Sequence, residues 1–426
     1  MPQKWNKLIL ALLPMLILEF SIILAGFWMM GDYDQIRFGV WQMSEWLINY
    51  QGGFVRRGLV GELLYQLHPE RPLIPVLNHL TFLFYLIYCT IFIFIYWLGR
   101  VRNRVVLIIS LLIPGGIFQM AISASFFTRK EILFLILLGL LCLLYLYIGS
   151  KAVSLRKQWL FLFSALAILG GLMLTFTHEA YLFMGFPYVL TLFWVLKKEN
   201  AHSLFLKRSY LSYLFAIPLV FLICAFDHGS VGISQEIWDS LTLADRVTIS
   251  PHAPYSVYGA IGGIGWGALQ NLSSLYGVFI TGGWPYWIFF ALGNCFVLIY
   301  ILRHLAFNVR LEGRQQFIQL VLLPFLLSLS MFIVGSDWGR WLASAGNQAL
   351  ILAFALSTST YISSKCSDEI LFWPNSWLLN GRLIGCGLCL WLIAFYELIF
   401  KLPECCIEYP HIFIQYLDFY RAIVGA

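Results

Sequence analysis

Eleven long apolar runs constrain this chain more than any other feature of its sequence. Most of them approach the roughly 20 residues that a membrane-spanning helix needs. Only 11% of the residues are charged and 60% are hydrophobic, so a soluble globule would lack the polar side chains to cover its surface. The sequence predicts an all-α polytopic membrane protein with about 11 transmembrane helices, at 8–30, 73–98, 105–123, 132–149, 159–177, 180–196, 210–226, 284–303, 316–334, 341–364 and 383–400.

The basic residues of the short connecting segments predict the orientation of the chain. If the N-terminus, with Lys4 and Lys7, lies in the cytoplasm, 17 basic residues fall on cytoplasmic segments and ten on the other side. This bias favours N-in, C-out. No small-residue cleavage site follows run 8–30, which we expect to be an anchor. The charges are scattered between apolar runs, which argues against nucleic acid as a partner. Size and composition suggest a bacterial inner membrane.

The chain reads as a single integral membrane domain over 1–426 with two longer outer segments, 31–72 and 227–283. In the first, apolar residues recur every three or four positions and the polar ones lie largely off that stripe: Ile36, Val40, Met43, Leu47 and Tyr50 against Asp34, Arg37, Glu45 and Asn49. This pattern predicts a helix lying flat at the outer interface. Proline, glycine and aromatic residues in 227–283 predict an irregular cap, and tyrosines in the tail 401–426 indicate another interfacial stretch.

Five clusters of ionisable residues fall on the predicted outer side. Such groups cost several kcal/mol near a bilayer unless they are paired or hydrated, so each is a candidate functional site. The clusters are Asp32 and Asp34; Arg56 and Arg57, within the glycine-rich stretch 51–58; Arg129 and Lys130, beside Glu131; His178 and Glu179; and Asp337, Trp338, Arg340 and Trp341.

The first three clusters suit the handling of a phosphate-linked substrate. Asp32 and Asp34 could supply a general base or ligands for a divalent cation, or could cap a helix. Paired arginines clamp phosphate oxygens, and glycines allow close approach to a ligand; alternatively, the arginines anchor the chain to anionic lipid headgroups. Two further cations, Arg129 and Lys130, suit a lipid-linked phosphate, unless one only pairs with Glu131.

The last two clusters have similar alternatives. His178 could move a proton or donate to a phosphate with Glu179 orienting it, although a lone histidine is usually structural. Asp337 and Arg340 are three residues apart and can pair on one helix face. The neighbouring tryptophans, Trp338 and Trp341, could stack on a sugar or sit in the aromatic belt of the membrane.

An anchor helix, followed by an outer loop that begins with Asp32 and Asp34 and continues as an interfacial helix, resembles the C-type (GT-C) membrane glycosyltransferases. The resemblance covers the architecture and about forty residues of the first loop. It implies that Asp32 or Asp34 is the catalytic base and that sugar comes from a polyprenyl-phosphate donor on the non-cytoplasmic face. The large soluble outer domain frequent in that superfamily is missing, which leaves lipid-linked or surface glycans as acceptors.

The chain also resembles O-antigen polymerases and ligases, which combine many helices with outer arginines and a long outer loop that 227–283 could supply. We therefore expect glycosyl transfer, with polysaccharide polymerisation as the alternative. A secondary transporter or flippase-like carrier stays open because Pro114-Gly115-Gly116 could break the third helix. So does a scaffold subunit without chemistry. The expected partners are a polyprenyl-phosphate-linked sugar donor, a glycan or glycolipid acceptor and the bilayer; a divalent cation is the single candidate cofactor.

Overall fold

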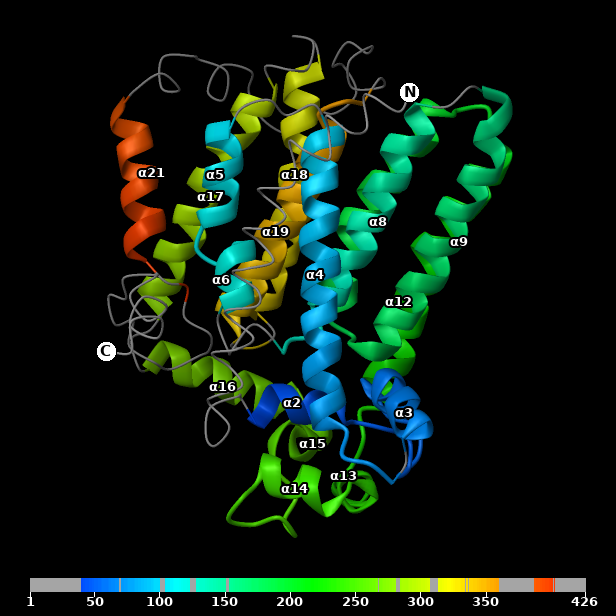
Figure 1. Cartoon of the computed structure of the whole chain (residues 1–426), viewed down its shortest axis with the longest axis vertical. Helices are drawn as coiled ribbons and strands as arrows, with labels where there is room; N and C mark the ends of the chain where they lie inside the picture. Colours follow the sequence, from blue (N-terminus) through cyan, green and yellow to red (C-terminus); the bar gives the residue numbers. More distant parts are fainter. Residues whose placement is uncertain are drawn as a thin grey trace.

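Long apolar helices standing side by side make up most of the molecule (Figure 1). The computed structural model describes residues 40–68, 70–99, 104–122, 128–150, 153–266, 268–280, 284–306, 313–333, 335, 337–359, 387–400 and 402, whose regular elements are all helical. Because lipid offers no hydrogen bonds, a spanning segment must satisfy its own backbone, as a helix does. Six helices are long and apolar enough to cross a membrane: α4 (Ile74–Leu98), α8 (Ile132–Gly149), α9 (Val153–Thr177), α12 (Leu204–Phe226), α17 (Trp284–Ala306) and α18 (Arg314–Ser328), which η3 (Leu329–Ile333) extends. The chain is a multi-pass membrane protein.

Helix α19 (Trp338–Leu356) runs through the middle of the bundle, and all 19 of its residues are buried. It packs against α4, α8, α17 and α18. Its polar side chains bond to neighbouring segments: Asn347 accepts a hydrogen bond from the Tyr88 hydroxyl at 3.1 Å and donates to the Gly115 carbonyl at 2.6 Å. In an apolar medium such bonds hold helices together where the hydrophobic effect cannot.

Two predicted spans are interrupted. The run 105–123 forms α5 (Arg104–Leu112) and α6 (Ile117–Ile122), and the break falls at Pro114-Gly115-Gly116, where Gly115 has a φ of +78°. The run 180–196 forms α10 (Tyr181–Met184) and α11 (Phe186–Glu199). The run 383–400 corresponds to α21 (Gly387–Ile399). The first run, 8–30, and nearly all of the tail 401–426 lie outside the described residues. The count of 11 spans thus stays a prediction.

Two segments far apart in the sequence fold together over one end of the bundle (Figure 1). Their buried side chains, among them Trp46, Ile237 and Trp238, form a hydrophobic core separate from that of the bundle. Asp245 of the second segment attaches to the start of α4, because its carboxylate accepts hydrogen bonds from the backbone N–H groups of Leu73 and Ile74 at 2.9 and 3.0 Å. We call this unit the cap; it consists of α2 (Val40–Trp46), α3 (Gly58–Leu67), α13 (Val231–Ser240), α14 (Leu243–Ile249), α15 (Gly259–Gly262) and η1 (Gly263–Gly265).

The described part of the first segment differs from the flat interfacial helix that its apolar stripe predicts. Helix α2 has only seven residues, and residues 42–49 are all buried, polar ones included. Glu45 is 1% exposed and Asn49 is fully buried. The reason is tertiary, since α14 and α15 pack against α2 and cover the face that would otherwise meet water.

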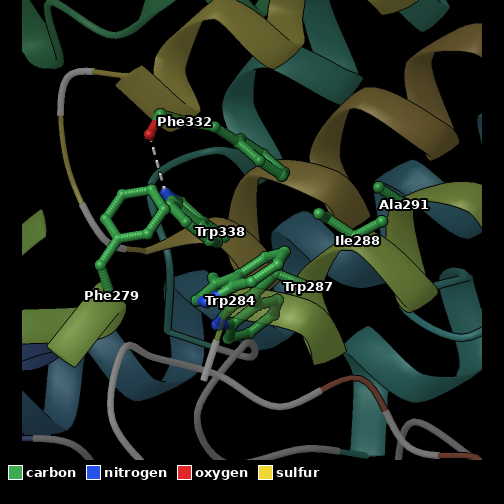
Figure 2. A pocket seen from close by; sticks show the side chains of 7 residues that line it. All are labelled: Phe279, Trp284, Trp287, Ile288, Ala291, Phe332 and Trp338. Atoms are coloured by element: carbon green, nitrogen blue, oxygen red, sulfur yellow. Dashed lines mark hydrogen bonds between the residues drawn. The ribbon is translucent and has the colours of Figure 1, made fainter. Parts of the chain in front are cut away.

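An apolar pocket opens at the edge of the bundle, where α16 (Ala268–Ile280) and α17 meet the start of α19 (Figure 2). Its volume is about 170 Å³. The rings of Trp338 and Phe332 are stacked at 5.3 Å, and Trp287 meets Trp338 edge-on at 6.0 Å. The pocket is lined by Phe279, Trp284, Trp287, Ile288, Ala291, Phe332 and Trp338.

Candidate functional site

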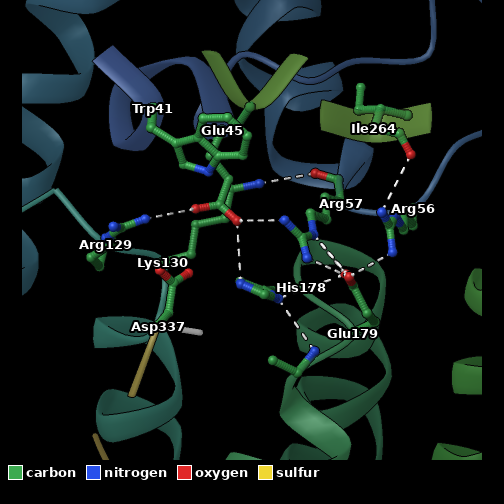
Figure 3. Close-up of polar contacts among 12 residues, drawn as sticks. Trp41, Glu45, Arg56, Arg57, Arg129, Lys130, His178, Glu179, Ile264 and Asp337 are labelled. Carbon is green, nitrogen blue, oxygen red and sulfur yellow. Dashed lines mark hydrogen bonds and ion pairs between the residues drawn. The ribbon is translucent and has the colours of Figure 1, made fainter. Parts of the chain in front are cut away.

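Charged residues from five separate segments meet between the cap and the bundle (Figure 3). Each segment ends or begins a helix there, so that side chains remote in the sequence converge on one place. We call the group the charged cluster; it comprises Glu45 from α2, Arg56 and Arg57 from the turn before α3, Arg129, Lys130 and Glu131 before α8, His178 and Glu179 between α9 and α10, and Asp337 and Arg340 at the start of α19.

Arg57 and Glu179 form the tightest pair in the charged cluster. The Arg57 Nε lies 2.9 Å from both carboxylate oxygens of Glu179, and Nη2 lies 2.5 Å from Oε1. Arg56 adds a weaker contact to the same carboxylate at 3.3 Å and also donates to the carbonyls of Ile264 and Trp266 in and after η1. A forked guanidinium–carboxylate contact fixes orientation as well as charge. These bonds therefore tie the first segment of the cap to the bundle and to the second segment.

Glu45 is the carboxylate on which most cations of the cluster converge. Its oxygens lie 3.3 Å from Nη1 of Arg57, 3.2 Å from Nε2 of His178, and 3.8 Å from Nη1 of both Arg129 and Arg340. These four partners come from four different segments. Glu45 therefore links the cap to the start of α8, the turn after α9 and the start of α19.

The start of α19 carries a second group of ion pairs. Arg340 Nη2 lies 2.6 Å from the Asp337 carboxylate, as the three-residue spacing predicts. Arg340 Nε lies 3.1 Å from Glu131, whose side chain is 1% exposed. Glu131 thus pairs with a cation. This cation is Arg340 from the remote helix α19, whereas the sequence suggested its neighbours Arg129 and Lys130.

Lys130 is a fully buried cation held by backbone carbonyls. Its Nζ donates to the carbonyls of Arg57 at 3.0 Å and Thr177 at 3.2 Å, and it lies 5.9 Å from the centre of the Trp46 ring. Burial, opposed by the nearby Glu45 carboxylate, lowers the pKa of Lys130 to about 8. Lys130 therefore connects the backbone at Arg57 to the end of α9 through hydrogen bonds.

Two carboxylates of the cluster, Glu45 and Glu179, are held ionised. Burial raises the pKa of Glu45, but the positive charges of His178 in its protonated form, Arg57, Arg340 and Lys130 outweigh it and bring that pKa below its ordinary value. Burial also opposes ionisation of Glu179, yet Arg57 and Arg56 hold its pKa well below the usual range. A carboxylate that resists protonation is a weak proton acceptor. Glu45 and Glu179 are therefore suited to orient cations and not to remove a proton.

His178 is a neutral imidazole at physiological pH. Burial, followed by the positive charge of Arg57, lowers its pKa to about 4 against the pull of Glu45, Glu179 and Glu131. Its Nδ1 accepts a hydrogen bond from the Ala180 backbone N–H at 3.2 Å. Since Nδ1 is the acceptor, Nε2 carries the proton of the neutral ring and points toward Glu45.

The backbone turn that carries the paired arginines has an unusual conformation. Arg57 has a φ of +68°, and among the described residues it is the only non-glycine residue with a positive φ. That conformation costs on the order of 1–3 kcal/mol and persists only where surrounding contacts enforce it. Here the Arg57 side chain and carbonyl are both bonded. Within the glycine-rich stretch 51–58, Gly53 has a φ of +104°; beyond that stretch, Gly61 of α3 packs directly on the Ile48 carbonyl.

The charged cluster has a buried interior and a partly open edge. Glu45, Glu131, Lys130 and His178 are almost fully buried, and Arg129 and Arg340 are 4% and 5% exposed. By contrast, the side chains of Arg56, Arg57, Glu179 and Asp337 retain 14%, 22%, 12% and 25% of their exposure. Five cationic groups face four carboxylates, so the cluster carries one excess positive charge when His178 is neutral. That excess lies among the buried groups, because the partly open side chains are two arginines and two carboxylates; the guanidinium groups of Arg56 and Arg57 are the cations open to an anion.

The structure brings together eight of the predicted site residues: Arg56, Arg57, Arg129, Lys130, His178, Glu179, Asp337 and Arg340. Asp32 and Asp34 lie outside the described residues. The two tryptophans, Trp338 and Trp341, are each 5% exposed and pack against Phe332, so they lie beside the cluster and not within it. The indole N–H of Trp338 donates to the carbonyls of Phe332 and Gly335 at 3.1 and 2.6 Å.

Sequence reasoning missed the central role of Glu45 and assigned it to the polar side of an interfacial helix. One signal was present: Glu45 is the only charged residue in the stretch 38–48. A carboxylate isolated in an apolar segment usually has a buried partner. The partners could not be identified without the fold, because they are between 12 and 295 residues away in the chain.

No group of three His, Cys, Asp or Glu side chains within the described part of the chain is arranged to hold a metal ion. Comparison of the chain with protein-family models, curated proteins and solved structures finds no match to any of the three.

Proposed function

We propose that this chain is a membrane glycosyltransferase of about 11 transmembrane helices, oriented N-in and C-out. It moves a sugar or glycan from a polyprenyl-phosphate-linked donor to a lipid-linked or cell-surface glycan on the non-cytoplasmic face. The proposal includes polymerisation of a polysaccharide, which would use the same site. Its setting is a bacterial inner membrane.

One observation carries the proposal: the convergence of five charged segments at one end of an apolar bundle. Assembling so many ionic groups next to a bilayer is costly, and a structural core would be built more simply from apolar side chains. The excess positive charge and the partly open guanidinium groups of Arg56 and Arg57 suit a phosphate. A phosphate attached to a lipid reaches such a site from within the membrane.

Different residues bind the phosphate, position the arginines and remove the proton. Arg56 and Arg57 hold the donor phosphate and stabilise the charge that develops on it as the bond to the sugar breaks. Glu45 and Glu179 fix the arginines and stay ionised. The base that removes the proton from the acceptor hydroxyl is Asp34 or Asp32, because the low pKa values of Glu45 and Glu179 make both weak bases.

A transfer assay tests this function. The purified protein is placed in lipid nanodiscs with polyprenyl-phosphate sugars and a mixture of glycolipid acceptors, and labelled product is followed by mass spectrometry. We expect transfer by the wild type and its loss in Asp34→Asn and Arg56→Gln. Arg71→Gln is the matched control, because Arg71 is an exposed arginine just after α3, outside the charged cluster.

The outcomes separate the alternatives. Transfer unchanged in a normally folded Arg56→Gln variant removes the phosphate role of the cluster. Transfer unchanged in Asp34→Asn and also in Asp32→Asn removes the assignment of the base. If the wild type gives no transfer, yet sugar lipids raise its thermal stability saturably, the chain is a carrier or accessory subunit.

A carrier is the second candidate, and the broken helix formed by α5 and α6 is the observation that favours it. The freed carbonyl of Gly115 is bonded by Asn347 of the buried helix α19. Interrupted helices with polar partners form substrate sites in many transporters. Flux of sugar lipid across proteoliposomes without glycosyl transfer would support this candidate.

A further inference from the structure

We propose that the aromatic pocket between α16, α17 and α19 binds the isoprene unit nearest the phosphate of a polyprenyl phosphate whose anionic head occupies the charged cluster. This inference rests on the proposed function and deepens it, because it assigns the lipid part of the donor to named residues.

The lining of the pocket suits a hydrocarbon and nothing more polar. All seven lining residues are aromatic or aliphatic (Figure 2). The indole N–H of Trp338 is already engaged by the carbonyls of Phe332 and Gly335. A polar group such as the ester of a glycerolipid would lose hydrogen bonds there and gain none from Trp338.

The pocket opens toward the surface that faces lipid. Phe279, Trp284 and Ile288 are 51%, 42% and 48% exposed, whereas Trp287 and Trp338 at the back are 4% and 5% exposed. An apolar side chain exposed on a membrane bundle is in contact with acyl chains. A lipid tail therefore enters the pocket sideways from the bilayer, without crossing water.

The size of the pocket matches one branched unit. An apolar cavity of about 150 Å³ takes up a six-carbon ring, and this one measures about 170 Å³. It is bounded by rings set at different angles: Phe332 lies parallel to Trp338 and Trp287 stands nearly perpendicular to it. A methyl-branched unit contacts more of these walls than a straight chain, and each contact adds dispersion energy.

The pocket adjoins the charged cluster through the first turn of α19. Trp338, which lines the pocket, directly follows Asp337, and Arg340 two residues later pairs with Asp337, Glu131 and Glu45. In a polyprenyl phosphate a single bond joins the phosphate oxygen to the first isoprene unit. The two subsites must then be adjacent, and the pocket adjoins the charged cluster at Asp337 and Arg340.

Binding of farnesyl phosphate tests the pocket without requiring catalysis. Apparent affinity is measured by thermal stabilisation in nanodiscs, beside an unbranched alkyl phosphate of the same main-chain length. We expect farnesyl phosphate to bind more tightly to the wild type. Ala291→Phe should fill the pocket and weaken binding about fivefold, equivalent to about 1 kcal/mol. The effect is modest because the competing solvent, the bilayer, is itself apolar.

Leu292→Phe is the matched control. Leu292 is the next residue of α17, is 64% exposed and does not line the pocket, so this variant should bind farnesyl phosphate like the wild type. Equal affinity of Ala291→Phe and the wild type overturns the proposal. Equal affinity of the wild type for branched and straight chains also overturns it.

A photoreactive farnesyl phosphate supplies a test that needs no variant. Crosslinks should fall on peptides from α16 and α17 that contain Phe279, Trp284 or Ile288; crosslinks confined to other helices contradict the assignment. The two proposals fail separately. Farnesyl phosphate binding without any sugar transfer removes the enzyme and keeps the pocket. If the wild type transfers sugar but binds farnesyl phosphate no more tightly than Ala291→Phe does, the enzyme is kept and the pocket assignment is removed.

Discussion

Removing the charge of Glu45 should be among the most destabilising single changes of a polar residue in the cap. The substitution Glu45→Gln keeps the size of the side chain and deletes its charge. It leaves Arg57, Arg129, Arg340 and the ring of His178 around a neutral amide at distances of 3.2–3.8 Å. Glu45 is 1% exposed, so water cannot replace the lost carboxylate.

The magnitude follows from these distances. At 3.3 Å and an effective dielectric constant of about 20, one ion pair is worth about 5 kcal/mol before the desolvation of its members is subtracted. Breaking a buried pair from one side costs about 3–5 kcal/mol in measured cases. Because Arg57 keeps Glu179 and Arg340 keeps Glu131 and Asp337, we expect the lower end, a loss of about 3 kcal/mol.

Unfolding in mixed micelles titrated with sodium dodecyl sulfate, followed by tryptophan fluorescence, measures this loss. Glu62→Gln is the matched control. Glu62, also in the first cap segment, is bonded to neutral donors, the Tyr50 N–H at 2.9 Å and the Gln66 amide at 2.6 Å. We expect it to cost less than about 1 kcal/mol. The reasoning is refuted if the two variants lose the same free energy of unfolding.

The acid dependence of the same variant gives an independent check. The folded pKa of Glu45 lies below its ordinary value of 4.5, so its contribution to stability is complete above that pH. The contribution is lost as pH falls toward the folded pKa. Wild type and Glu45→Gln should therefore converge in stability on acidification below pH 4.5; a constant difference down to acid pH contradicts the electrostatic origin of the effect.

Three further predictions follow from neighbouring contacts. The folded pKa of His178 is about 4, against an ordinary value of 6.5. As pH falls from 6.5 to 4, wild-type stability should therefore decrease by up to about 1.4 kcal/mol per pH unit. A pH series of unfolding curves measures this slope, which His178→Asn should remove. Asp245→Ala leaves two buried N–H groups at the start of α4 unbonded and should cost about 2 kcal/mol in the same titration; a loss below about 0.5 kcal/mol would show that the cap is attached elsewhere. Gly61→Ala places a methyl group against the Ile48 carbonyl and should destabilise the cap, as measured by proteolysis, whereas Gly346→Ala, with no neighbouring atom within 4 Å, should not.

Most helices of the bundle could be predicted from the sequence because a spanning helix forms all its backbone hydrogen bonds within itself. A run of about 20 apolar residues is both necessary and locally sufficient for such a helix. Six predicted runs correspond to helices of that kind, within a few residues. The sequence raised the break at Pro114-Gly115-Gly116 only as an alternative and did not predict the one at Gly185, because hydropathy does not register such breaks and their consequences depend on neighbouring helices.

From the sequence, the candidate site could be predicted only as separate charged segments. Each charged segment stands out because an ionisable group near a bilayer is costly, and that cost is a property of the residue and its local sequence. Which groups pair is not local. Arg57 pairs with Glu179, which is 122 residues away in the chain. Glu62 lies much nearer in the sequence, so distance along the chain does not predict this pair.

The sequence by itself determined that this chain is a helical membrane protein, where its principal helices run and which polar segments must find partners. Hydrophobicity and backbone hydrogen bonding act over a single helix, so these properties can be read one segment at a time. Only the tertiary structure decided that Glu45 is the centre of the charged cluster and that Trp338 lines a pocket beside it. Ion pairing and cavity shape depend on distances between side chains of remote segments, and the packing of α8 against α9 and α19, and of α2 against α4, sets those distances.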